Sequence, residues 1–111
     1  MTSIEARAVA YNSLQAVETA RTKCLSAIEI WWKAFSEENN LQGKVTDTRD
    51  REGELIWNNG VICFRRSVRG KSYTTVVWSA NDYIDSRRRD TVPDLGATGR
   101  DILQSYMPVK E

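Results

Sequence analysis

The sequence contains no histidine, and this excludes most of the familiar acid–base and nucleophilic active sites. Histidine is the commonest general base, so Ser-His and Cys-His catalytic pairs have no second member here. Two cysteines without a histidine also fall short of the ligand set of a tetrahedral zinc site. Cys24 and Cys63 lie far apart in different predicted elements, and we expect both to be free, buried thiols. We therefore expect no catalytic residues, no metal and no cofactor.

The sequence also lacks long apolar runs and a strong net charge. No apolar run approaches the ~20 residues of a membrane span, and the first residues lack the basic-then-apolar order of a signal peptide. We therefore expect a cytoplasmic protein. The net charge of +1 gives no overall preference for nucleic acid or acidic lipid. The segment Gly96-Ala-Thr-Gly99 is too short for a phosphate-binding loop and follows no predicted strand, so we interpret it as a turn.

What the sequence does contain is enough apolar material for one domain of 111 residues. We predict an α+β fold over residues 1–111. A long N-terminal helix at about 2–38 packs on a three-stranded antiparallel meander at about 53–79. A C-terminal segment, 80–111, adds short helical pieces.

The N-terminal helix is predicted from its start signal and its apolar spacing. Thr2 and Glu5 fit a capping box, and apolar residues then recur at steps of four and three as far as Phe35. Some 36 helical residues would span ~54 Å, whereas a compact chain of this size is only ~35 Å across. Either the helix breaks near Thr19 to Thr22, or its first half projects and pairs with a second copy. We favour a homodimer, with an interface at Ala10, Leu14 and Val17.

Two tight turns define the meander. Asn59-Gly60 is a strong signal for a two-residue hairpin turn, and a second turn is expected at Gly70. The first turn pairs Trp57 with Ile62 and Leu55 with Phe64. Side chains alternate along strands, so these four share one face. If the second turn also has two residues, that face continues on the third strand with Tyr73, Thr75 and Val77. This face is the expected core, packed on the helix.

The opposite face of the meander is the expected partner-binding surface. It carries Ile56, Val61, Cys63, Arg65, Val76 and Trp78, more apolar than a solvated face requires. Tryptophan and arginine are enriched at interface hot spots. We predict a partner-binding patch made of Trp32, Ile56, Val61, Arg65 and Trp78. The alternative is that the C-terminal segment folds over this face and buries it.

A local excess of basic residues supports a second hypothesis. From Val61 to Arg89 the chain has seven cations and two acids. A basic hairpin can grip phosphates, so the candidate nucleic-acid contacts are Arg66, Arg69, Lys71, Arg87, Arg88 and Arg89. Charges on an exposed hairpin also protect it from aggregation, which is the simpler explanation. The nearby acids Glu54, Asp82 and Asp85 alternate with arginines, and we interpret them as members of solvated ion pairs.

From these observations we expect a small, non-enzymatic binding protein that associates with another protein, as an adaptor or inhibitor. The alternative is a nucleic-acid-binding protein that uses the basic hairpin. Small neutral proteins without diagnostic motifs are frequent among phage and mobile-element accessory genes, and this association agrees with the first hypothesis. The partner's identity does not follow from the sequence.

Overall fold

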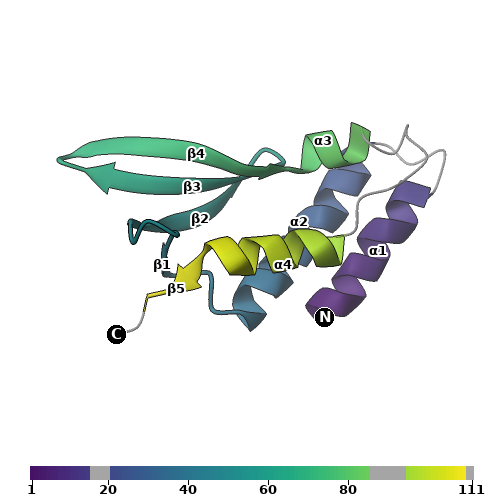
Figure 1. Ribbon diagram of the computed structural model, residues 1–111. Coiled ribbons are helices and arrows are strands. Elements are labelled where there is room, and N and C mark those ends of the chain that lie inside the picture. Colours follow the sequence, from purple (N-terminus) through teal and green to yellow (C-terminus); the bar gives the residue numbers. More distant parts are fainter. Residues whose placement is uncertain (16–20, 86–94, 110–111) are drawn as a thin grey trace.

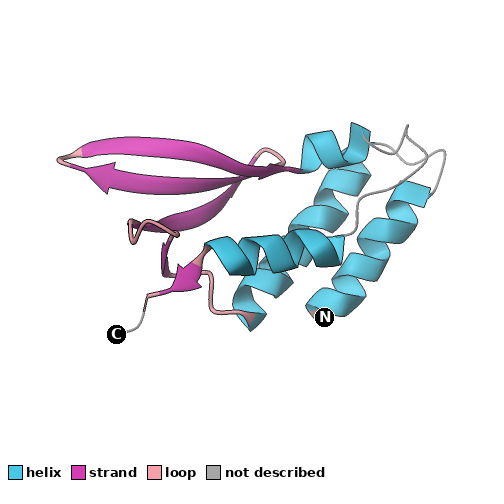
Figure 2. Ribbon diagram, viewed as in Figure 1, coloured by secondary structure: helices cyan, strands magenta, loops and turns pink. Residues whose placement is uncertain are grey.

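The computed structural model describes residues 1–15, 21–85 and 95–109 and shows an α+β protein with a five-stranded antiparallel sheet (Figure 1). The strands follow the spatial order β4-β3-β2-β1-β5. Helices gather at one end of the molecule, and the β3–β4 hairpin extends away from them at the other (Figure 2). The elements in chain order are α1 (Ser3–Gln15), α2 (Arg21–Glu38), β1 (Lys44–Thr46), β2 (Glu52–Asn58), β3 (Val61–Val68), β4 (Lys71–Ser79), α3 (Ala80–Asp85), α4 (Leu95–Ser105) and β5 (Met107–Pro108).

The expectation of one long N-terminal helix is wrong. The segment forms two helices, α1 and α2, that pack against each other. The backbone N–H of Ser3 donates a 2.7 Å hydrogen bond to Glu38 Oε1, joining the first turn of α1 to the last turn of α2. Residues 35 positions apart would lie ~50 Å apart in a continuous helix. The chain therefore doubles back, which agrees with the alternative of a broken helix. The predicted capping box of Thr2 and Glu5 is present at the start of α1.

Both predicted hairpin turns are confirmed. Asn58 pairs with Val61 and Val68 pairs with Lys71, so each turn has two residues. The φ angles are positive at both central residues of each turn: 50° and 87° at Asn59-Gly60, and 52° and 80° at Arg69-Gly70. This geometry twists the backbone in the same sense as the flanking strands. The predicted pairs Leu55–Phe64 and Trp57–Ile62 follow from it.

A β-bulge in β4 changes the face on which Trp78 was expected. Cys63 pairs with Val76, but the preceding residue of β3, Ile62, pairs with Trp78. Val77 is thus the extra residue, since a bulge sets two residues opposite one. The shift brings Trp78 to the face of Ile62. The prediction that it lies on the opposite face is wrong because it assumed strict alternation as far as Ser79.

The core lies between this face of the sheet and the helices. The seam predicted in α2 is buried at Cys24, Ile28 and Trp31. The Trp31 ring meets the edge of Trp78, with centroids 6.1 Å apart. After α4, the ring of Tyr106 lies 5.1 Å from that of Phe64. The meander face predicted to be the core therefore packs on α2 and on the C-terminal segment together.

The C-terminal segment is more regular than expected. The Ser79 hydroxyl accepts a hydrogen bond from the Asp82 N–H and caps α3. Helix α4 already begins at Leu95, so Gly96 and Gly99, which we assigned to a turn, lie in its first half. Beyond α4, β5 pairs with β1 and adds a short edge strand to the sheet. The hydrophobic contact with Phe35 that places Gly99 could not be read from local sequence.

Candidate binding surfaces

The open face of the sheet is the surface opposite the helices. We use this name for the residues that alternate with the core positions of the three long strands: Glu52, Glu54, Ile56, Asn58, Val61, Cys63, Arg65, Ser67, Ser72, Thr74 and Val76. Its middle row is apolar, because Ile56, Cys63 and Val76 lie side by side on adjacent strands. Val76 is 64% exposed. Solvent therefore reaches the β4 end of this row, whereas Cys63 in its middle is buried. A strand face that is wholly solvated would carry polar residues at these positions.

An ion pair borders this apolar row. Arg65 Nη2 donates a 3.0 Å hydrogen bond to Glu54 Oε2 on the neighbouring strand. Both side chains are about half exposed, and such a pair contributes little to stability. It does hold the guanidinium toward β2, in the row next to Ile56 and Cys63 on this face, where a partner carboxylate can compete for it. Three predicted partner-binding residues, Ile56, Val61 and Arg65, thus share this face.

The two tryptophans predicted for the same patch lie elsewhere. Trp32 is only 4% exposed and is part of the core. Trp78 is half-buried and its ring contacts Trp31 and Tyr83. Neither belongs to the open face, so the predicted patch is not brought together as a whole. Cys63 and Val76 take their place, and the alternation of β3 and β4 already indicated both residues.

The β3–β4 hairpin carries the basic residues. Between Val61 and Ser79 the chain has four cations and no acid. Arg69 and Lys71 are exposed at the turn, and Arg66 is half-exposed on the face opposite Arg65. The hairpin reaches beyond the rest of the sheet (Figure 1). The remaining candidates, Arg87, Arg88 and Arg89, lie outside the described residues.

The predicted oligomer residues fall in or after α1. Ala10 is completely buried within its own chain, where α1 packs on α2. Leu14 belongs to the last turn of α1, but its side chain is outside the described part, as is Val17. The length argument for a helical dimer no longer holds, because α1 and α2 already cover each other. A homodimer through α1 stays a prediction without that support.

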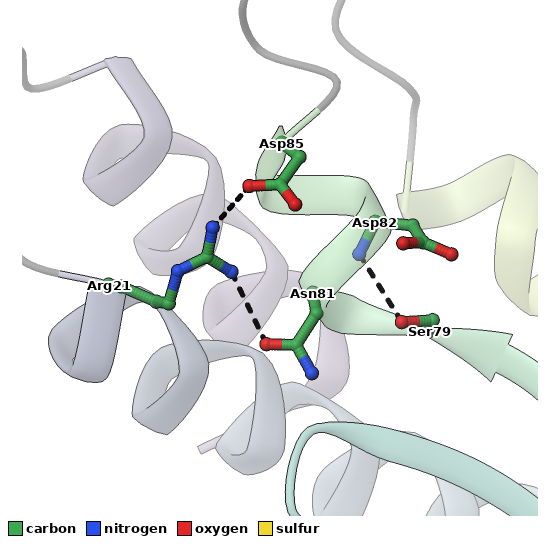
Figure 3. Close-up of polar contacts among 5 residues, drawn as sticks. All are labelled: Arg21, Ser79, Asn81, Asp82 and Asp85. Carbon is green, nitrogen blue, oxygen red and sulfur yellow. Dashed lines mark hydrogen bonds and ion pairs between the residues drawn. The ribbon is translucent and has the colours of Figure 1, made fainter.

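Several of the described carboxylates form ion pairs or hydrogen bonds within the chain. Arg21 bridges Asn81 and Asp85 and ties α3 to the start of α2, while Asp82 points away from it (Figure 3). Burial alone would raise the pKa of Asp47, but hydrogen bonds from the backbone and side chain of Arg51 lower it. The expected ion pairs of Glu54 and Asp85 are confirmed. In the three described ranges, no group of three potential metal ligands comes together.

The described residues line several hollows, two of which border a tryptophan. A narrow one of about 160 Å³ lies between β4 and α4, beside Trp78 and Ile102. A wider one of about 460 Å³ lies between α2 and the β2–β3 turn, beside Leu25 and Trp57. The first is smaller than the ~300–1,000 Å³ of typical ligand sites. The second falls within that range, but one of its lining residues is Glu29, whose carboxylate forms an ion pair with Lys33. Both cysteines are buried and neither forms a disulfide, as predicted.

None of the protein-family models, curated proteins or solved structures compared with this chain matches it. No described helix combines the length and the apolar character that crossing a membrane requires.

Proposed function

We propose that this is a small, non-enzymatic, cytoplasmic binding protein that associates with another protein through the open face of its sheet. It acts as an adaptor or inhibitor, by covering or competing for a surface of its partner. The observation that carries this proposal is the apolar row Ile56, Cys63 and Val76, which is exposed at Val76 and bordered by Arg65. A row of this kind offers apolar burial at its centre and a charged group at its rim, which is the usual anatomy of an interface.

The partner surface that fits the open face is apolar with an acidic edge. Burial of Val76 and its neighbours supplies affinity, while Arg65 supplies orientation and faster encounter. The Glu54 carboxylate holds Arg65 in place before binding, so its side chain loses less freedom when the partner arrives. The tryptophans contribute indirectly, by keeping the opposite face of the sheet packed.

The experiment compares two valines on opposite faces of one hairpin. Val76→Asp places a carboxylate on the open face, and Val68→Asp does the same on the other face, where Val68 is 40% exposed. Used as baits in a native lysate, Val68→Asp should retain the wild-type partner. Val76→Asp should weaken its capture at least about tenfold, because an unpaired buried charge costs more than 1.4 kcal/mol.

Equal loss with both valine variants, or no loss with either, contradicts the open-face proposal. Both variants change exposed positions, so thermal unfolding should show that each remains folded. Nuclease treatment of one half of the lysate separates protein partners from those held through nucleic acid.

Nucleic-acid binding remains the second candidate, favoured by the four cations and absent acids of the projecting hairpin. A two-stranded ribbon fits the major groove of DNA. Binding should weaken steeply with salt, and the triple variant Arg66→Gln, Arg69→Gln, Lys71→Gln should reduce the salt slope by about 0.9 per lost phosphate contact. Lys23→Gln on α2 is the control. Failure of the wild type to bind at low salt excludes this candidate.

A further inference from the structure

The outer edge of the sheet at β4 has no strand beside it among the described residues. β4 is nine residues long and ends the strand order, next to β3 alone (Figure 1). All of its residues from Lys71 to Val76 are exposed. Natural edges are usually protected by charges, prolines or irregular backbone. This one has a single charge, Lys71, no proline, and a bulge only near its end.

The backbone of this edge is arranged for pairing. The residues flanking a two-residue hairpin turn exchange both hydrogen bonds, so Lys71 directs its N–H and C=O toward β3. Alternation then turns the N–H and C=O groups of Ser72, Thr74 and Val76 outward, before the bulge begins at Val77. Three alternate residues therefore present a regular ladder of donors and acceptors to an incoming strand.

We propose that the incoming strand is β4 of a second copy of this chain, added antiparallel about a two-fold axis at Thr74. In this register Thr74 meets its own counterpart and Ser72 meets Val76, so every outward backbone group between them has a partner. On the other face of the ribbon, Tyr73 meets Thr75. Aromatic, threonine and β-branched residues are favourable cross-strand neighbours. Tyr73 and Val76, now 48% and 64% exposed, lose solvent contact in the pair.

Charge complementarity favours a second copy over an arbitrary strand. The only charge of β4 is at its start, so two antiparallel copies hold their Lys71 side chains at opposite ends of the ladder. The basic turn with Arg69 then lies beside Ser79 of the partner chain. The first turn of α3 follows there and carries Asp82, whose carboxylate points away from Arg21 (Figure 3). The pairing therefore sets a basic turn against an acidic helix start twice, by symmetry.

This dimer does not depend on the open-face partner. A two-fold axis perpendicular to the sheet keeps both open faces on the same side, so pairing would join them into one ten-stranded sheet with a broader surface. Self-association is measured on the purified chain alone, whereas the open-face proposal is measured by partner capture. The two can thus fail separately.

The first test replaces an outward N–H. Thr74→Pro removes a donor that β3 does not use, and proline is tolerated on an edge whose N–H faces solvent. Sedimentation equilibrium should show a dimer for the wild type and for the control Thr74→Val, and a monomer for Thr74→Pro with an unchanged circular dichroism spectrum. A wild type that stays monomeric up to about 1 mM overturns the proposal. A folded Thr74→Pro variant that still dimerises also overturns it. So does a Thr74→Pro variant that loses the capture of another protein while its own self-association is unchanged.

A second test stays valid if the proline variant fails to fold. Thr74→Cys places two sulfurs on residues whose Cα atoms would be about 5.5 Å apart, a distance that suits a disulfide. Mild oxidation should convert most of this variant to a covalent dimer. The exposed control Ser67→Cys, one strand further in, leaves its counterpart at least ~14 Å away and should react at least tenfold more slowly. Equal cross-linking of both variants overturns the proposal. Cys24 and Cys63 are buried and do not compete.

Discussion

At the scale of single residues, the molecule depends on a few positions where one atom more or less changes the packing. Gly53 is one of them, because it faces the Phe64 ring across the β2–β3 ladder. A Cβ atom placed on Gly53 would lie 2.7 Å from Phe64 Cε1 and 2.5 Å from the carbonyl oxygen of Arg65. Neither neighbour can withdraw easily, since Phe64 is buried and the carbonyl belongs to β3, which is paired with a strand on each side.

Gly53→Ala is therefore expected to destabilise the protein by about 1–3 kcal/mol, the usual cost of overpacking. The matched control is Gly43→Ala, where a Cβ would meet no atom within 4 Å, and its unfolding free energy should stay within about 0.5 kcal/mol of the wild type. Urea unfolding followed by fluorescence of the tryptophans measures both. A Gly53→Ala variant as stable as the control would contradict the close contact with Phe64.

At the scale of elements, the bulge in β4 decides what the strand contributes. It lets β4 serve two purposes: the part before Val77 is regular and exposed, and the part after it turns Trp78 toward the helices. Trp78 then bridges Trp31 in α2 and Tyr83 in α3, with ring centroids 6.1 and 5.5 Å apart. The aromatic cluster thus connects the consecutive elements β4 and α3 with α2, which is distant in sequence.

Trp78→Ala should cost about 3 kcal/mol, because it removes a large side chain from a packed cluster. Tyr73→Ala, on the same strand but half-exposed, should cost less than about 1 kcal/mol. Thermal and urea unfolding at low protein concentration provide the comparison. If Trp78→Ala unfolded like the wild type but lost a binding partner, the bulge assignment would be wrong and Trp78 would belong to the open face.

At the scale of the whole molecule, the two ends of the helical hairpin are held by one carboxylate. Glu38 accepts hydrogen bonds from the Ser3 hydroxyl and from the Ser3 backbone N–H. These bonds, that of the hydroxyl first, lower the pKa of Glu38 from its ordinary value of 4.5. A carboxylate with a lowered pKa stabilises the folded state above about pH 4.5, and this contribution is lost as the pH falls through the folded-state pKa.

The wild type should therefore lose thermal stability between pH 5 and pH 3 more steeply than Glu38→Gln, which cannot ionise at this position. At neutral pH the variant should be the less stable of the two, and the difference should shrink in acid. Melting curves recorded by circular dichroism across this range provide the measurement. Other carboxylates, including Asp47, titrate in both proteins, so only the difference between them reports on Glu38. Parallel pH profiles would show that the Ser3 contact does not link the two helices.

The sequence by itself determined everything that depends on near neighbours in the chain. The capping box at Thr2, the two turns at Asn59 and Arg69, and the register that follows from them are local, because each is set by backbone preferences within a few residues. The spacing of the apolar residues in α2 likewise predicted which of them are buried. This is why the open face could be assigned as far as Val76.

Only the tertiary structure decided which distant segments meet. The return of α2 along α1, the early start of α4 and the bulge at Val77 arise from contacts between residues tens of positions apart, and no local pattern encodes them. Trp32 is therefore buried in the core and Trp78 packs against it. The length argument for a helical dimer also no longer holds. Contacts of this kind also placed β4 at the edge of the sheet, because strand order follows from the packing of the whole chain rather than from the preference of any one strand.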